Sequence, residues 1–235
     1  MIINPYPGTY FAFEGIDGCG KTTLVDMFLA WLGGIKHLSV RRTKEPDKNG
    51  LFGRRIYEDL SRPNGLHVTN PALFQGWYAC DSLINIRDNV IPVISKKNGA
   101  VVSDRSRLSM IYGAKNIQEV YELLNVNNGI LGVHFIWPDA IFVLDVSVEV
   151  AIDRLKRKGR TLDGHESEDK LKTARELYKL VANPPEDESS IRNDFPNCHL
   201  INAEREIDIT LDDVLKIAVK ILNRRGQLAA KPEAE

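Results

Sequence analysis

The stretch Phe13-Glu14-Gly15-Ile16-Asp17-Gly18-Cys19-Gly20-Lys21-Thr22-Thr23 carries more information about architecture than any other part of the chain. Its residues 15–22 match the phosphate-binding pattern G-x-x-x-x-G-K-[ST] at every fixed position. Glycines in such a loop let successive backbone N–H groups turn inward around a polyphosphate, and the helix that follows directs its positive dipole end toward the same anion. The stretch therefore predicts a phosphate-binding loop.

The residues on both sides of this loop have the order that the motif requires. Residues 10–13 form an apolar, aromatic run typical of a buried strand, and apolar residues recur at helical spacing over residues 24–32 until Gly33 and Gly34 end the helix. Strand, glycine loop and helix together predict a P-loop nucleotide site. In such a site Lys21 reaches the terminal phosphates and Thr22 holds Mg²⁺.

Length and composition restrict the class of protein. The 235 residues, 43% hydrophobic and 27% charged, are enough for one α/β domain with a small lid. A net charge of −1 creates no long-range field for a nucleic acid polymer or an anionic membrane, so nucleotide-sized partners fit better. Three scattered cysteines and the lack of a signal peptide or an apolar span predict a soluble, cytoplasmic protein.

Strands and helices are expected to alternate along the chain. We expect strands at residues 38–40, 100–103, 140–144 and 198–201, and helices at residues 51–60, 71–98 (bent at Pro92), 117–124, 148–158 and 168–182. Thr210 and Asp213 predict a capping box for a last helix. We predict one domain over residues 1–226 with a lid at about 157–168 and a disordered tail at 227–235. The expected fold is three-layer α/β with a parallel sheet of about five strands.

A second acidic element selects among the classes of P-loop protein. The chain has no Asn-Lys-x-Asp guanine motif, and the strand at 100–103 leads into Asp104-Arg105 instead of the Asp-Glu of motor ATPases. An arginine at this place points to a second anion beside the nucleotide. If that anion is a nucleoside monophosphate, it is already largely ionised at neutral pH, so positioning and charge neutralisation suffice for transfer.

Five motifs in order make the chain similar to the thymidylate kinase family. The family's opening F-[IV]-x-[FL]-E-G-x-[DE]-G-x-G-K-[ST]-T resembles residues 11–23, and its T-R-E-P-G-G-T-x-L-G segment resembles residues 43–53. F-A-A-D-R is similar to residues 78–82, D-R-[YH]-x-x-S to residues 104–109, and P-D-x-x-x-x-L-D-x-x-x-E-x-A to residues 138–151. The resemblance spans residues 11 to about 182.

The resemblance implies a role for each matching residue. The donor ATP would be bound by the loop residues Gly15, Ile16, Asp17, Gly18, Cys19, Gly20, Lys21, Thr22 and Thr23. Thr22 and Asp104 would hold the Mg²⁺ that accompanies ATP, and Arg105 would grip the acceptor phosphate. Asp17 would lie near the acceptor phosphate and sugar, and Glu45 and Tyr78 would line the acceptor cleft. The family also implies a homodimer.

An arginine over the transferring phosphoryl group is expected for catalysis. The variable loop positions contain no basic residue, so the lid must supply it, with Arg154, Arg157 and Arg160 as candidates. The chain departs from the family at Ser82, where the family has an arginine that reads thymine, and at Gly164, where the lid has its second arginine.

These observations predict an ATP-dependent kinase that converts dTMP to dTDP. A kinase for a monophosphate with another base keeps the same mechanism. A deoxynucleoside kinase would share the Glu45-Pro46 and Asp104-Arg105-Ser106 segments but would need Glu45 as a base for a neutral hydroxyl. A degenerate member that binds nucleotide without turnover is the alternative from a different class.

Overall fold

A five-stranded parallel sheet forms the centre of the molecule in a computed structural model that describes residues 2–159 and 167–228. Its order is β3-β4-β2-β6-β7, with every neighbouring pair parallel. The strands are β2 (Thr9–Glu14), β3 (Ser39–Lys44), β4 (Gly99–Asp104), β6 (Ala140–Asp145) and β7 (Cys198–Asn202). The prediction of a three-layer α/β fold with about five parallel strands is confirmed.

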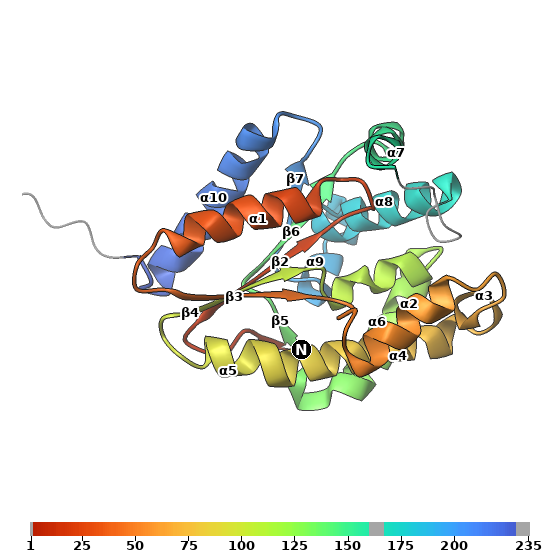
Figure 1. The fold of residues 1–235 in the computed structure, drawn as a ribbon, viewed down its shortest axis with the longest axis horizontal. Coiled ribbons are helices and arrows are strands. Elements are labelled where there is room, and N and C mark those ends of the chain that lie inside the picture. The colour runs from red at the N-terminus through yellow and green to blue at the C-terminus, as the bar shows by residue number, and fades with distance from the viewer. Residues whose placement is uncertain (1, 160–166, 229–235) are drawn as a thin grey trace, which may run out of the picture.

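Helices cover both faces of this sheet (Figure 1). The α-helices are α1 (Lys21–Gly33), α2 (Leu51–Leu60), α3 (Leu66–Thr69), α4 (Pro71–Asn85), α5 (Ile91–Ile94), α6 (Ile117–Leu131), α7 (Val148–Arg157), α8 (Glu168–Ala182), α9 (Ile191–Asp194) and α10 (Ile207–Arg224). Helices α1 and α10 lie together on one side of the sheet, and α4 and α5 lie on the other (Figure 1). None of the described helices is both long and apolar enough to cross a membrane.

The alternation of side chains along β2 divides its residues between the two faces. Phe11 and Phe13 contact Phe28 of α1 at centroid distances of 5.2 and 5.4 Å, and both also contact Phe142 of β6. Because successive side chains of a strand point to opposite faces, Glu14 lies on the other side, where its carboxylate accepts a hydrogen bond from Tyr178 of α8. The apolar face anchors α1 behind the phosphate-binding loop.

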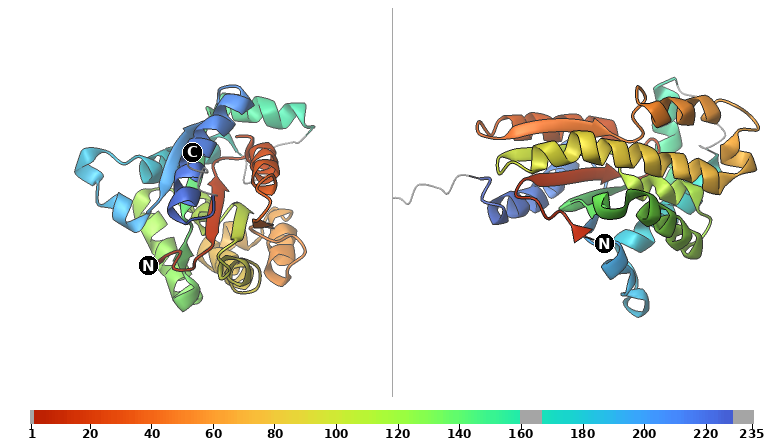
Figure 2. Two further views of the ribbon diagram at one scale, coloured as in Figure 1. Left: turned by 90° about the vertical axis from the view of Figure 1, so that its left-hand side faces the viewer. Right: turned by 90° about the horizontal axis from the view of Figure 1, so that it is seen from below.

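The long helix predicted for residues 71–98 is divided into three parts. Asn70 caps α4 as expected, because its side chain accepts a hydrogen bond from the backbone N–H of Leu73 at 3.2 Å. A π-helical turn at Ile86–Val90 connects α4 to α5. The right-hand view of Figure 2 shows these segments as one rod across the sheet. The irregularity thus precedes Pro92, because the missing N–H of proline already disturbs the turn before it.

Two predictions at the C-terminal end are wrong. Helix α10 begins at Ile207, so Thr210 lies inside it and donates to the Glu206 carbonyl at 3.1 Å instead of forming a capping box. Asp213 is ion-paired with Arg205. Gln227, expected in a disordered tail, is 1% exposed and donates to the carbonyls of residues 97 and 99. The other tail positions from 229 onward lie outside the described residues.

A second sheet was not expected. The short strands β1 (Ile2–Ile3) and β5 (Ile136–Trp137) pair in parallel beside the main sheet. Two-residue strands give no periodicity that a sequence pattern can detect. Three 3₁₀ segments at Arg107–Gly113, Gly132–His134 and Glu186–Glu188 were also missed; the first follows β4 directly and carries residues of the site.

Candidate active site

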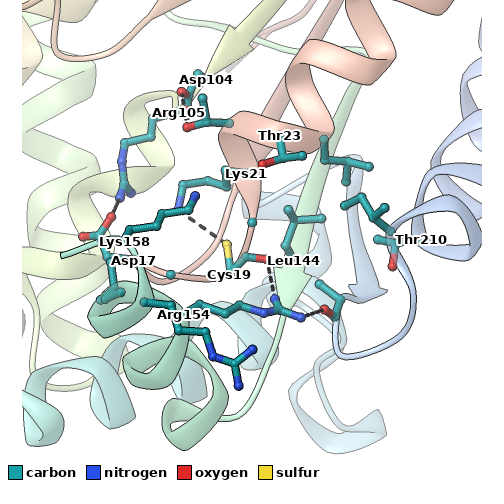
Figure 3. A pocket seen from close by; sticks show the side chains of 18 of the residues that line it. Asp17, Cys19, Lys21, Thr23, Asp104, Arg105, Leu144, Arg154, Lys158 and Thr210 are labelled. Atoms are coloured by element: carbon teal, nitrogen blue, oxygen red, sulfur yellow. Dashed lines mark hydrogen bonds and ion pairs between the residues drawn. The ribbon is translucent and has the colours of Figure 1, made fainter. Parts of the chain in front are cut away.

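A cavity of about 450 Å³ lies where the carboxyl ends of the central strands meet (Figure 3). This is the edge at which open parallel sheets bind ligands. The predicted loop residues Asp17, Gly18, Cys19, Gly20, Lys21, Thr22 and Thr23 line it, together with Asp104 and Arg105. The sequence therefore located the walls contributed by the loop and by β4.

Gly15 and Ile16, the first two residues of the predicted ATP-binding loop, do not line this cavity. Their carbonyls instead accept hydrogen bonds from the Lys21 ammonium, at 2.7 Å and 3.0 Å. The same ammonium lies 3.5 Å from the Cys19 sulfur (Figure 3). Lys21 is only 7% exposed, so the loop surrounds its own cation. A charge held in this way is positioned for an anion bound in the concave side of the loop.

Three glycines of the loop adopt positive φ angles. Gly15, Gly18 and Gly20 have φ of 130°, 84° and 98°, which an L side chain rarely adopts. Gly18 also lies against α7, because a Cβ atom added there would stand 2.3 Å from the Ala151 carbonyl oxygen. Gly18 is a variable position of the general phosphate-binding pattern, and both its positive φ and its packing against α7 favour glycine there.

Thr22 and Asp104, the predicted metal-binding pair, lie together. The Thr22 hydroxyl donates to Asp104 Oδ2 at 3.3 Å, although 82 residues separate them in the chain. Asp104 is 2% exposed, and the cations of Lys44 and Arg42 approach its Oδ2 at 3.7 and 3.8 Å. Both candidate ligands present oxygen atoms, the donor type that Mg²⁺ prefers.

Arg105 lies on the other side of the loop and forms an ion pair with Asp17 (Figure 3). Its guanidinium also lies over the ring of Tyr112 at 5.2 Å, and the hydroxyl of Tyr112 accepts a hydrogen bond from the Asp17 backbone N–H at 2.7 Å. Arg105 has a φ of 74°, a conformation that costs roughly 1–3 kcal/mol in residues other than glycine. A strained arginine held by both an acid and an aromatic ring is a sign of a binding role.

Glu45 and Tyr78, predicted for the acceptor side, lie away from the large cavity. They line a smaller cavity. The Glu45 carboxylate is 3% exposed and accepts hydrogen bonds from Ser82 and, at 2.8 Å, from Asn85 Nδ2. Burial raises the pKa of Glu45, whereas the nearby charge of Arg107 and these hydrogen bonds act in the opposite direction.

The lid arginines differ in their surroundings. Arg154 donates to the Cys19 carbonyl at 3.3 Å and to the Ala203 carbonyl at 3.1 Å, so it connects the loop to the end of β7. Arg157 lines the large cavity, is 77% exposed and is ion-paired with Asp153 at 2.7 Å. Arg160 lies outside the described residues.

Sequence reasoning missed the wall that the C-terminal region contributes. The large cavity is also lined by Ala203, Arg205, Ile207 and Thr210, and in Figure 3 Thr210 lies across the cavity from the loop. Residue 203 directly follows β7, so the rule that ligands bind at the carboxyl ends of parallel strands could have identified it. It also missed Arg107 and Ser109, which line the smaller cavity.

Comparison with known proteins gives a consistent result. The family model described as thymidylate kinase matches residues 13–207. A thymidylate kinase of Thermosipho melanesiensis is 29% identical over 222 residues, which cover 91% of this chain and 99% of the relative. A thymidylate kinase of Thermosipho africanus is 30% identical, with 91% and 98% covered, and a probable thymidylate kinase of Methanosphaera stadtmanae is 29% identical, with 78% and 95% covered.

Proposed function

Since this chain belongs to the thymidylate kinase family, we propose that it transfers the γ-phosphoryl group of ATP to dTMP, giving ADP and dTDP. The observation that carries the proposal is the Arg105–Asp17 pair at the edge of the phosphate-binding loop. It supplies a second anion-binding group beside the nucleotide cavity, which a simple ATPase does not need.

Each phosphate has its own cation in this arrangement. The loop amides and Lys21 bind the donor phosphates, and Arg105 binds the phosphate of dTMP through its planar fork of N–H groups. Asp17 holds the guanidinium in its orientation until the acceptor arrives. Because the acceptor phosphate is already ionised at neutral pH, the protein contributes alignment and charge neutralisation, and needs no general base.

Mg²⁺ fits the residues at the end of β4. Thr22 and Asp104 would hold it directly or through water, since both present oxygen atoms toward the phosphate side of the loop. Bound there with ATP, the ion would neutralise charge on the β- and γ-phosphates. The cations of Lys44 and Arg42 lie beside this carboxylate, at 3.7 and 3.8 Å from Asp104 Oδ2.

The catalytic arginine of the lid is assigned to Arg157 or Arg160. Arg157 already lines the nucleotide cavity at the end of α7, and its exposed partner Asp153 can release it at little cost, because exposed ion pairs contribute about 0–1 kcal/mol. Arg154 is less suited to moving toward a phosphoryl group, since it is engaged with two backbone carbonyls. A homodimer, as the family implies, belongs to this proposal.

The structure favours this reaction over phosphorylation of a nucleoside. A neutral 5′-hydroxyl needs a base within hydrogen-bonding distance. Glu45 is the carboxylate that sequence analysis offered for this role, but both of its oxygens accept hydrogen bonds from side chains of α4, namely Ser82 and Asn85. A carboxylate occupied in this way has a structural role.

The proposal is tested by incubating the protein with ATP and Mg²⁺ and one acceptor at a time, and identifying products by mass. The acceptors are dTMP, dUMP, dCMP, dGMP, dAMP and thymidine. We expect dTDP and ADP in equal amounts, and no dTMP from thymidine. Product from thymidine alone would contradict the proposal, as would tight ATP binding without any product.

A further inference from the structure

Arg107 is an arginine without a complete set of partners. Its side chain is buried, with 3% of its surface exposed, in the 3₁₀ segment that follows β4. Nη2 donates to the Ile136 carbonyl, whereas the N–H groups of Nε and Nη1 have no hydrogen-bond partner among the described residues. Leaving buried donors of a charged group unpaired is costly, so such groups usually serve a ligand or an ordered water.

The guanidinium of Arg107 is held firmly in place. It lies over the rings of Phe135 at 4.9 Å and Trp137 at 5.4 Å. These stacking contacts and the Ile136 carbonyl hold one edge of the planar group. The N–H groups of Nε and Nη1, which lie on different edges of the guanidinium, are therefore presented in fixed directions.

A small cavity adjoins this arginine. Its volume is about 10 Å³, and it is lined by Arg107 together with Glu45, Tyr78, Ser82, Ser109 and Met110, among others. This is room for about one water-sized group. The carboxylate of Glu45 is near enough for the Arg107 charge to act on its pKa, but its oxygens accept hydrogen bonds from Ser82 and Asn85 and none from Nε or Nη1 of Arg107.

One residue of the small cavity also contacts Arg105. Ser109 lines it and also accepts a hydrogen bond from Arg105 Nη1 at 3.4 Å. Arg105 is the residue assigned to the acceptor phosphate, so the small cavity begins one side chain away from that phosphate. A nucleotide whose phosphate lies on Arg105 can direct its base toward this side.

We propose that Arg107 reads the acceptor base, and that one of its N–H groups without a partner among the described residues donates to an exocyclic carbonyl oxygen in the small cavity. The proposal rests on the proposed function. A guanidinium can only donate hydrogen bonds. It can therefore bind a keto oxygen, which accepts them, but not an amino group at the same position, which is itself a donor. The site thereby selects thymine or uracil over cytosine.

The test compares dTMP with 5-methyl-dCMP, which differ in whether position 4 bears a keto oxygen or an amino group. For the wild-type protein we expect kcat/KM to favour dTMP by at least roughly 10- to 100-fold, the range for a hydrogen bond to a charged donor. In Arg107→Met, which keeps an apolar contact with the two rings, this preference should fall toward one. The KM for ATP should not change.

Arg225→Met provides the matched control. Arg225 is another largely buried arginine, but its guanidinium is bonded to Asp139 and to the carbonyls of Asn4 and Tyr6, none of which lines the small cavity. Its loss should lower the melting temperature and leave the ratio between the two nucleotides unchanged. If Arg107 only supported the fold, Arg107→Met would behave in the same way, and the proposal would be wrong.

Binding measurements separate this proposal from the proposed function. If the wild-type protein converts neither nucleotide, phosphoryl transfer is refuted, and calorimetric Kd values for the two nucleotides then decide the role of Arg107. Equal Kd values for dTMP and 5-methyl-dCMP would refute the proposed role of Arg107. If Arg107→Met does not fold, Arg107→Lys, which keeps the charge but loses the fork, should still reduce the preference for dTMP; an unchanged preference would overturn the assignment.

Discussion

Individual residues at the nucleotide site depend on partners that lie far away in the chain. Lys21 is buried and donates to two carbonyls of its own loop. Asp17 and Arg105 are 88 residues apart and form an ion pair. The site is therefore organised by contacts among its own residues, and its cations are in place for anionic substrates.

Lys21→Met should lower kcat/KM for ATP by roughly 10²- to 10³-fold, because the cation directed at the transferring phosphoryl group is removed. The substitution should also lower the unfolding free energy by about 1–2 kcal/mol, because the loop carbonyls that accept from Lys21 lose their donor. ADP release and thermal unfolding measure the two effects separately. Lys36→Met, which removes an exposed lysine, is the control and should change neither; wild-type turnover in Lys21→Met would refute the site.

Elements are joined at the site by close backbone contacts. The loop after β2 packs on α7 at Gly18, so the phosphate site and the helix leading to the lid share one contact. On the acceptor side, Asp81 of α4 accepts a hydrogen bond from the Asp47 backbone N–H at 2.9 Å and so holds the segment after β3. Both contacts hold a loop of the site against a helix.

Gly18→Ala should destabilise the protein more than Gly20→Ala. Both positions have positive φ, so each substitution should cost about 1–2 kcal/mol in unfolding free energy. At Gly18 the new methyl group also collides with the Ala151 carbonyl, whereas at Gly20 the nearest atom is 3.8 Å away. We expect a further cost of about 1–3 kcal/mol at Gly18. Equal urea midpoints for the two variants would contradict this packing.

Asp81 should make stability depend on pH. Burial raises the pKa of Asp81 to about 7, while its hydrogen bond from Asp47 acts in the opposite direction. The folded state then holds a proton that the unfolded state has lost, so the contribution of Asp81 to stability is present below about pH 4 and is lost as pH rises through 7.

Asp81→Asn provides the comparison, because the amide oxygen can still accept from the Asp47 N–H. Relative to this variant, the wild-type protein should lose unfolding free energy between pH 5 and pH 8. Urea unfolding at several pH values measures the difference. Parallel curves for the two proteins would show that Asp81 ionises at an ordinary pKa.

At the scale of the whole molecule, the C-terminal segment is hydrogen-bonded to the sheet at the end opposite the site. Gln227 is bonded to Thr9 of β2, to the carbonyl of Gly99 at the start of β4 and to the carbonyl of Lys97 just before it. Its own carbonyl lies 2.7 Å from His37 Nε2. One side chain thus connects the start of two central strands with the end of α10.

Gln227→Ala should lower the unfolding free energy by about 1–3 kcal/mol, because it leaves buried backbone carbonyls without donors. Arg224→Ala, an exposed change in the last turn of α10, is the control and should stay within about 0.5 kcal/mol. Thermal or urea unfolding compares them. A neutral Gln227→Ala would mean that the predicted tail does begin at residue 227.

The sequence by itself determined the phosphate-binding loop, the alternation of strands and helices, the parallel sheet and the motifs around Asp104 and Glu45. These features follow from short-range spacing, backbone conformation and side-chain periodicity, all of which a local pattern contains. Only the tertiary structure decided that Gly18 packs against the Ala151 carbonyl, that the Glu45 carboxylate accepts hydrogen bonds from Ser82 and Asn85, and that two N–H groups of Arg107 have no partner among the described residues. Such properties depend on which distant segments meet in space, and hydrogen-bond satisfaction can be assessed only after they have met.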